Sequence, residues 1–325
     1  MVVEHHIFWG TPVAIYLFLA GVGAGAVTVS GSVLLRGGHR GGDMFSLARY
    51  GALIGPIPVI IGTICIIFEL GRWDRALNLY KVINLSPMSI GSWLLGLFIM
   101  TSIFYALVFV PSLFPRLEDW TRRLWPAMQS LAWINVPLGI GVAVYTGVLL
   151  GAMPSRPLWN SPILAFLFLI SALSTGIATM ILARTIFHRE GGTAGVASGG
   201  SHQGFHESGY LLTASDLMLI GFELLVIFLF LLFAHLTIGN LKYAIAIIQP
   251  GGLMAPLFWF WVVLIGLVVP GLIELFYVIP RLLYKKEYNP PRGVEFMISL
   301  AVLIGGFMLR YVIVMAGQMT WPQGI

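Results

Sequence analysis

Residues 124–155 read LWPAMQSLAWINVPLGIGVAVYTGVLLGAMPS and contain no Asp, Glu, Lys or Arg. A helix needs about 20 apolar residues to cross the hydrocarbon core of a bilayer, so this run is long enough for one crossing. Further uncharged runs occur along the whole chain, at residues 12–35, 50–68, 82–115, 157–183, 224–241 and 243–273. A last stretch, residues 296–317, is interrupted only by Arg310. The pattern predicts an all-α integral membrane protein.

The composition of the whole chain excludes the alternatives to a membrane protein. Of its 325 residues, 58% are hydrophobic and only 10% are charged, whereas soluble domains average about 45–50% and about 25%. A soluble globule would need more polar surface, and a disordered chain would contain fewer apolar residues. We expect about eight transmembrane helices, at residues 12–35, 49–70, 89–111, 126–150, 160–186, 213–237, 256–280 and 296–317. They leave no segment for a soluble catalytic domain.

Lysine and arginine are distributed unevenly between alternate loops. One set of loops contains Arg36, Arg40, Arg49, Arg116, Arg122, Arg123, Arg184, Arg189, Arg281, Lys285, Lys286 and Arg292. The other set contains only Arg72, Arg75, Lys81, Arg156 and Lys242. Because cytoplasmic loops carry the excess of Lys and Arg, the first set is predicted to be cytoplasmic and both termini extracytoplasmic. The chain is then a multi-pass protein of a bacterial or archaeal cytoplasmic membrane, and its basic pI requires no nucleic-acid partner.

A Gly/Ser-rich stretch divides the predicted helices into two groups. Residues 191–201 read GGTAGVASGGS, a composition typical of flexible linkers. We therefore expect a cytoplasmic linker at residues 187–211. It separates an N-terminal transmembrane bundle at residues 1–186 from a C-terminal bundle at residues 212–325.

The residues that commonly hold redox cofactors are scarce in this protein. Cys65 is the single cysteine, so the protein can form neither an internal disulfide nor a Cys-ligated iron–sulfur cluster. His235 is the only histidine well inside a predicted span, whereas a transmembrane haem commonly uses two histidines. We expect no haem, cluster or metal on this chain. Any electrons must therefore come from, or go to, a partner protein or a diffusible carrier.

Five charged residues lie inside the predicted spans, where each charge costs at least about 2.5–3.5 kcal/mol. Glu69 and Arg310 form an outer group, and Asp216, Glu223 and Glu274 form an inner acidic group. The inner acids are candidates for a proton path, with Asp216 and Glu223 seven residues apart on one helical face. The alternative is acids near helix ends that reach toward the interface, and one buried protonated acid. For Asp216, which lies within a turn of the expected helix start, this alternative is favoured.

Tyr145 differs from the other aromatic residues near the span ends. It lies about one turn inside the outer end of its span and is followed by Thr146 and Gly147. A buried phenol needs a hydrogen-bond partner, and a carbonyl group of a lipophilic ligand is one candidate. A position in the aromatic belt or a contact between helices are the alternatives.

Several stretches, taken in order, resemble the polysulfide reductase membrane-subunit family, also called the NrfD-like family. They are WGTPVAIYLFL at residues 9–19, GRWDR at 71–75 continuing to SPMSIGSW at 86–93, YTGVLL at 145–150, RPLWN at 156–160, and LRY at 309–311 through AGQ at 316–318. The resemblance runs from the first predicted helix to the last and so covers essentially the whole chain.

The resemblance implies a subunit that has no cofactor of its own and binds quinone, either menaquinone or ubiquinone, near the outer face. It implies electron exchange between the membrane quinone pool and an extracytoplasmic four-cluster ferredoxin-like iron–sulfur protein. That partner would serve a molybdopterin oxidoreductase or a multihaem cytochrome. The terminal substrate would then react on a partner subunit.

The resemblance also assigns roles to residues. Tyr145 matches the tyrosine that is expected to hydrogen-bond the quinone head group. Tyr16 occupies a position where some sulfur-reducing members carry a His, and Val13 one where they carry an Asn. In this assignment Arg72 and Asp74 orient the rim of the pocket or the partner protein.

Oxidation of a quinol releases two protons, so the mechanism needs an acceptor at the outer end. Glu69 and His6 are the candidates for this catalytic role. Coupling to the membrane potential would require a path through Glu223 and Glu274. Two other classes of function remain open: a purely structural membrane anchor and a secondary transporter. The transporter would need two inverted halves, against which the division into five and three helices argues.

Overall fold

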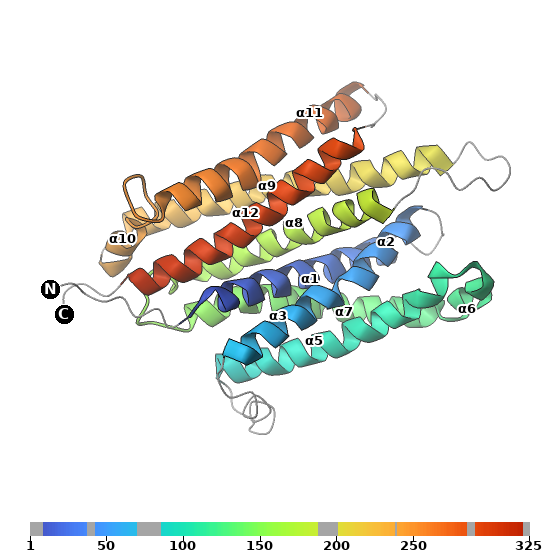
Figure 1. The fold of residues 1–325 in the computed structure, drawn as a ribbon, viewed down its shortest axis with the longest axis horizontal. Helices are drawn as coiled ribbons and strands as arrows, with labels where there is room; N and C mark the ends of the chain where they lie inside the picture. Colours follow the sequence, from blue (N-terminus) through green and yellow to red (C-terminus); the bar gives the residue numbers. More distant parts are fainter. Residues whose placement is uncertain are drawn as a thin grey trace.

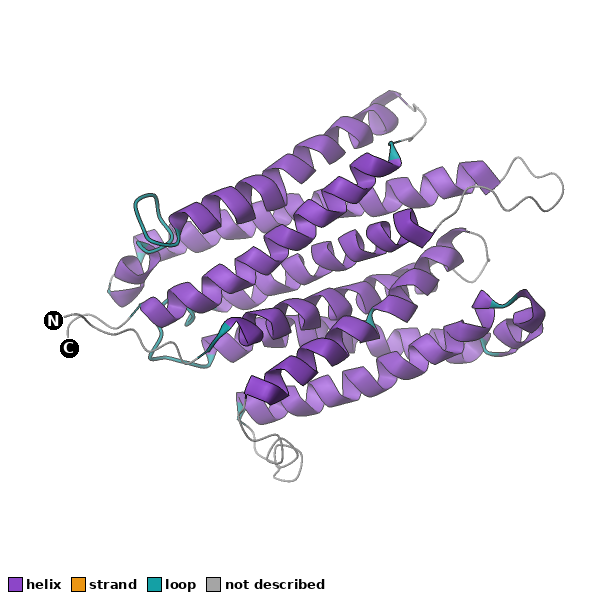
Figure 2. Ribbon diagram, in the orientation of Figure 1, coloured by secondary structure: helices purple, strands orange, loops and turns teal. Residues whose placement is uncertain are grey.

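The computed structural model describes residues 9–37, 43–69, 86–187, 201–237, 239–284 and 290–320. All regular structure in these ranges is helical, and eight helices are long and apolar enough to cross a membrane (Figures 1 and 2). The prediction of an all-α, multi-pass membrane protein is confirmed.

Four of the spans are single helices: α1 (Thr11–Arg36), α7 (Trp125–Gly151), α8 (Pro162–Phe187) and α12 (Arg292–Met319). The span before α7 consists of α5 (Pro87–Phe109) and the 3₁₀ helix η3 (Val110–Leu113). The second span is formed by α2 (Asp43–Ile54) and α3 (Pro56–Glu69), and the seventh by η5 (Leu257–Val268) and α11 (Val269–Tyr284). Helix α9 (Ser201–Leu236) supplies the sixth span, and η4 (Pro115–Leu117), α6 (Glu118–Arg123) and α10 (Asn240–Ile245) are short connecting helices.

Proline and serine set several of the helix boundaries. The Ser86 side chain accepts a hydrogen bond from the Ser89 amide at 3.3 Å, and Pro87 occupies the first turn of α5. Both features favour a helix start, since they satisfy or remove amides that have no intrahelical partner. Pro56 interrupts the second span in a similar way, and the Gly55 amide still donates to the Gly51 carbonyl at 3.0 Å.

Helix α9 is longer than the sequence predicts. It begins at Ser201 rather than near residue 213, and so includes much of the expected linker at residues 187–211. The rest of that linker, residues 188–200, lies outside the described residues. Asp216 is therefore several turns inside a helix.

Small residues bring α1 against its neighbours. A Cβ atom on Gly25 of α1 would meet the backbone of Ala172 in α8, and one on Gly176 of α8 would meet the backbone of Gly25. On another side of α1, Gly139 of α7 lies against the Thr28 hydroxyl. Close backbone approach of this kind drives helix association in membranes, where burial of apolar surface does not.

The two predicted bundles share one hydrophobic core. Helix α8 packs against α1, α7, α9 and α12, and α12 also packs against α1 and η5. One cluster of buried apolar side chains accordingly runs from α1 through α7 and α8 to α9 and α12. The C-terminal helices lie along one side of this central pair in Figure 1.

Helix α1 begins and α12 ends at the same end of the molecule (Figure 1), which we call the Trp9 end. The opposite end, the basic end, carries most of the described cations: Arg36, Arg49, Arg116, Arg122, Arg123, Arg184, Arg281 and Arg292. The described cations of the Trp9 end are Arg156 and Lys242. This asymmetry is the basis of the prediction that the basic end is cytoplasmic.

Candidate functional site

The first and last helices are tied together at the Trp9 end. The Trp9 amide donates to Gln318 Oε1 at 2.8 Å, and Gln318 Nε2 donates to the Trp9 carbonyl at 2.8 Å. Arg156 Nη1 donates to the Gln318 carbonyl at 2.7 Å, and Trp159 Nε1 donates to the Ile313 carbonyl at 2.8 Å. The Trp9 and Trp159 rings stack with their centres 5.3 Å apart. Residues that are far apart in the sequence thus form one hydrogen-bonded clasp.

Tyr145 lies in a tight seat between α5 and α7. It is 9% exposed, and a Cβ atom on Gly91 of α5 would overlap the Tyr145 ring. Two residues on, Gly147 lies against the backbone of Ala165 in α8. Among the described residues the Tyr145 hydroxyl has no hydrogen-bond partner. The phenol is therefore fixed by packing while its hydroxyl stays available for a ligand.

Tyr16 occupies a similar depth on α1. It is 4% exposed, and its Cα lies 3.5 Å from the position of a Cβ on Gly62 of α3. At about 1.5 Å of rise per residue, Tyr16 lies about 8 Å from the start of α1 and Tyr145 about 9 Å from the end of α7. Both tyrosines are thus in the part of the bundle next to the Trp9 end, as predicted for Tyr145.

The other candidates for the outer site cannot be placed. Glu69 is the last residue of α3, but its side chain lies outside the described part of the structure, as do His6, Arg72 and Asp74.

An open cavity of about 440 Å³ lies near Tyr145 at the Trp9 end. Its lining comes from the start of α5, the end of α7, the loop that follows α7, and the start of α8: Pro87, Gly147, Val148, Gly151, Ala152, Asn160, Ser161, Pro162 and Ala165. Small-molecule sites are typically concave, mostly apolar and about 300–1,000 Å³ in volume. Pro87 is one helical turn from Gly91, so the cavity and the seat of Tyr145 share the first turns of α5.

A second group of polar side chains crosses the interior. Arg310 of α12 is fully buried; its Nη1 donates to Ser171 Oγ at 2.9 Å and to the Gly306 carbonyl at 2.8 Å. Its guanidinium carbon is 5.3 Å from the centre of the Phe168 ring and 5.8 Å from that of Phe18. Two further nitrogens, Nε and Nη2, have no hydrogen-bond partner within the described ranges.

Two acids of α9 approach this arginine across α8. Glu223 interacts with the Ser171 hydroxyl and, electrostatically, with Arg310. Asp216 accepts a hydrogen bond from Ser174 Oγ at 2.7 Å and lies on the same helical face as Glu223. Arg310 therefore belongs with the inner acids, and its predicted grouping with Glu69 near the outer end is wrong. The favoured interpretation of Asp216 as an interfacial acid is also wrong, since its side chain is fully buried.

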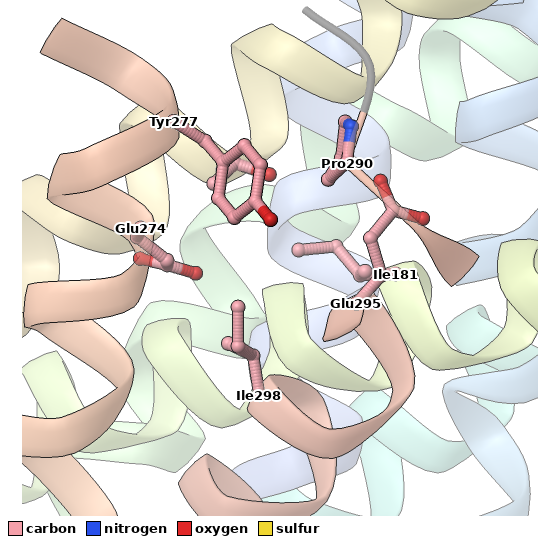
Figure 3. Close-up of a pocket in the computed structure, with 7 residues that line it drawn as sticks. Ile181, Glu274, Tyr277, Pro290, Glu295 and Ile298 are labelled. Atoms are coloured by element: carbon pink, nitrogen blue, oxygen red, sulfur yellow. The ribbon is translucent and has the colours of Figure 1, made fainter. Parts of the chain in front are cut away.

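Glu274 of α11 continues this group toward the basic end. Its side chain is 1% exposed, interacts electrostatically with Asp216, and has no hydrogen-bond partner among the described residues. The Glu274 carboxyl and the Tyr277 hydroxyl point into a small pocket, with Glu295 on its other side (Figure 3). The pocket has a volume of about 10 Å³, close to the minimum of about 10–15 Å³ that one water needs. Glu295 accepts a hydrogen bond from Thr185 Oγ1 at 3.3 Å.

The comparison with known proteins extends over nearly the same residues as these contacts. A model of the family described as "Polysulphide reductase, NrfD" matches residues 2–322. The chain belongs to this family. It is 30% identical to protein NrfD of Escherichia coli (strain K12), over 96% of this chain and 95% of that protein. It is 31% identical to the C chain of polysulfide reductase from Wolinella succinogenes, again over 96% and 95%.

A more distant relative is the C subunit of selenate reductase from Mesobacillus selenatarsenatis, 23% identical over 94% of this chain and 73% of that protein. Membership in the NrfD family, together with the names of these relatives, supports a membrane subunit of an oxidoreductase complex. In the described residues no group of three or more His, Cys, Asp or Glu side chains could hold a metal ion.

For this NrfD-family protein the acids and Arg310 span a large part of the membrane depth. At about 1.5 Å per residue, Glu295 lies about 5 Å from the start of α12 and Glu274 about 15 Å from the end of α11. On the same scale, Glu223 lies about 20 Å from either end of its span and Arg310 about 27 Å from the start of α12. The group reaches from the basic end past the middle of the bundle. We call these residues, with Asp216, the interior polar chain.

The sequence alone did not point to Glu295, Ser171 or Ser174. Glu295 is separated from the buried Ile298 and Val302 by three and seven residues, so helical periodicity would have placed it on the buried face of α12. The two serines carry no comparable signal, because their role depends on which helix faces α8.

Proposed function

We propose that this protein is the quinone-reactive membrane subunit of a respiratory reductase complex. In this role it exchanges electrons between the membrane quinone pool and an extracytoplasmic iron–sulfur protein. The observation that carries the proposal is the seat of Tyr145: a buried phenol without a hydrogen-bond partner among the described residues, next to an open cavity at the Trp9 end.

The chemistry of a quinone suits this part of the molecule. Its apolar ring and isoprenoid tail favour a lipophilic cavity, and each ring oxygen can accept a hydrogen bond from a phenol. Tyr145 would donate this bond, and Gly91 would keep the phenol in one position. Tyr16 would line the site from α1. Oxidation of one quinol yields one quinone, two electrons and two protons.

Glu69 and His6 are proposed as acceptors of these protons, and Arg72 and Asp74 as part of the rim or of the partner interface. The electrons would leave one at a time for a four-cluster ferredoxin-like partner, which would serve a molybdopterin oxidoreductase or a multihaem cytochrome. The names of the polysulfide reductase and selenate reductase relatives support a partner of the first kind. Menaquinone and ubiquinone both fit this scheme.

The test compares two Tyr→Phe variants in the assembled complex. Tyr145→Phe removes the proposed donor, so we expect about 1 kcal/mol weaker quinol binding, or about a fivefold higher KM. Tyr105→Phe is the control, because Tyr105 is also buried but its hydroxyl lies 3.2 Å from Ser30 Oγ near the basic end. Electrons supplied by a reduced viologen dye directly to the partner should bypass the site and give unchanged rates. Unchanged quinol kinetics in Tyr145→Phe would favour the structural anchor instead.

We further propose that the interior polar chain passes protons between the basic end and the middle of the membrane. Supporting observations are the contacts from Glu274 to Asp216 and from Glu223 to Arg310, and the water-sized pocket beside Glu295. Carboxyl and hydroxyl groups that are linked in this way can pass protons. Each proton that crosses a potential of 100 mV represents about 2.3 kcal/mol.

Sealed vesicles that contain the complex test this second proposal. Glu223→Gln should lower the membrane potential formed per quinol oxidised, and Glu274→Gln should do the same while leaving the Glu223–Arg310 interaction in place. Asp119→Asn, which changes an exposed carboxyl of α6, is the matched control. Absence of any potential in the unmodified complex, or unchanged coupling in both glutamine variants, would contradict the proton path.

A further inference from the structure

A cavity of about 400 Å³ lies at the basic end, apart from both the seat of Tyr145 and the interior polar chain. It is formed where α2 meets η3, the residue that follows η3, and α6. Its lining combines apolar side chains with one cation and two hydroxyl residues: Phe45, Arg49, Pro111, Ser112, Leu113, Phe114 and Thr121. None of these lining residues carries a carboxylate, so the cavity has a net positive charge.

Arg49 is the group in this cavity with unused binding capacity. One of its terminal nitrogens, Nη1, donates to the Ser112 carbonyl at 3.1 Å, which fixes the side chain against η3. Its Nε is buried and has no hydrogen-bond partner among the described residues. A guanidinium carries five N–H donors in a planar fork that matches a phosphate. Arg49 is thus held in place with donors left over.

The surroundings of the cavity are apolar and lie at the depth of an interface. Leu113 is 49% exposed, Phe114 54% and Trp120 57%. Arg49 is six residues into α2, or about 9 Å from its first residue at 1.5 Å per residue. Exposed Trp residues are typical of the boundary between hydrocarbon and head groups. A ligand in this cavity would therefore contact both a cation and a surface that faces acyl chains.

We propose that this cavity binds the head group of an anionic phospholipid. The phosphate would accept hydrogen bonds from Arg49 and from the Thr121 hydroxyl, and the acyl chains would lie along Leu113 and Phe114. The apolar lining favours a lipid over free phosphate. The absence of a lining carboxylate leaves no partner for the ammonium of a zwitterionic head group, so anionic lipids are preferred. This inference is independent of the proposed quinone chemistry.

The experiment uses the purified full-length protein in detergent after removal of native lipid. Phosphatidylglycerol, phosphatidylcholine with the same acyl chains, and inorganic phosphate are added separately. Bound lipid is counted by native mass spectrometry, and the melting temperature is recorded. We expect phosphatidylglycerol to bind and to raise the melting temperature, while the other two additions have little effect. Equal effects of the two lipids, or protection by inorganic phosphate alone, would overturn the proposal.

Two variants and one control locate the site. Arg49→Gln should weaken phosphatidylglycerol binding at least tenfold. Thr121→Val keeps the shape of the side chain but removes the hydroxyl, and should weaken binding two- to fivefold even if Arg49→Gln fails to fold. Arg123→Gln is the control, since Arg123 is exposed on α6 but does not line the cavity. Wild-type binding in Thr121→Val, or an equal loss in Arg123→Gln, would place the lipid elsewhere.

Discussion

Gly91→Ala tests the seat of Tyr145 by adding a single methyl group. The new Cβ atom would overlap Cζ, Cε2 and the hydroxyl oxygen of Tyr145, so the ring or α5 must move. Overpacking of this kind costs about 1–3 kcal/mol. A helical Gly→Ala change by itself should stabilise by about 0.5–1 kcal/mol. We therefore expect a net loss of about 0.5–2 kcal/mol in unfolding free energy, together with weaker quinol binding because the phenol is displaced.

The matched control is Gly141→Ala on α7. Its Cβ would lie 3.4 Å from the two Leu94 Cδ atoms, so a flexible side chain of α5 needs to give only slightly. This variant should be neutral or slightly more stable, with normal quinol kinetics. Thermal unfolding in detergent and quinol-dependent turnover are measured for both variants. Equal stability and activity in Gly91→Ala and wild type would refute the packing of Tyr145 on Gly91.

A double-mutant cycle separates this contact from other effects of the substitution. If the overlap with Tyr145 causes the loss, Gly91→Ala should cost less in a Tyr145→Ala background. The coupling free energy should then differ from zero by about 0.5–3 kcal/mol, as is usual for residues in contact. A cycle that is additive within error would assign the loss to some other neighbour.

Two further predictions concern contacts between helices. Gln318→Ala removes the paired hydrogen bonds with Trp9 and should lower the unfolding free energy by about 1–3 kcal/mol; thermal unfolding measures this, and an unchanged midpoint would argue against the clasp. Ser174→Ala leaves Asp216 without its hydrogen-bond donor and should cost about 1–3 kcal/mol, whereas Ser130→Ala, at an exposed serine of α7, should cost almost nothing. Equal midpoints for the two serine variants would contradict the role of the Asp216 contact.

The sequence predicted most of the fold because the bilayer imposes one length on every span. Uncharged runs therefore mark the helices directly, and Pro87 or Pro162 marks where a helix begins. The start of α9 was predicted wrongly because residues 201–212 include polar side chains, and hydropathy does not report a helix that extends out of the apolar region. Hydropathy detects the membrane-spanning part of a helix rather than its full length.

The partners of the interior polar residues could not be predicted in the same way. Periodicity placed Asp216 and Glu223 on one face of a helix, but not the helix that this face meets. The pairing of Glu223 with Arg310 depends on α8 lying between α9 and α12, with Ser171 as the shared contact. Such packing is set by small residues and close approach on several helices at once.

The clasp at the Trp9 end shows the converse case. Trp9, Trp159 and Gln318 were noticed in the sequence as parts of the family resemblance, without a role for each. Their hydrogen bonds and ring stacking show that they join the ends of the chain. Tyr145 was placed correctly near the outer end because its depth follows from its distance to the end of the span. Its contact with Gly91 required the packing of α5 on α7.

Photolabelling with a quinone analogue tests the central claim most directly. The analogue carries a photoreactive group on its ring, and an excess of the native quinone serves as competitor. We predict that labelled peptides come from the first turns of α5 and the last turns of α7, around Gly91 and Tyr145, and that the competitor suppresses the labelling. Labelling that persists in excess quinone, or that falls only on helices away from Tyr145, would contradict a quinone site at this end of the molecule.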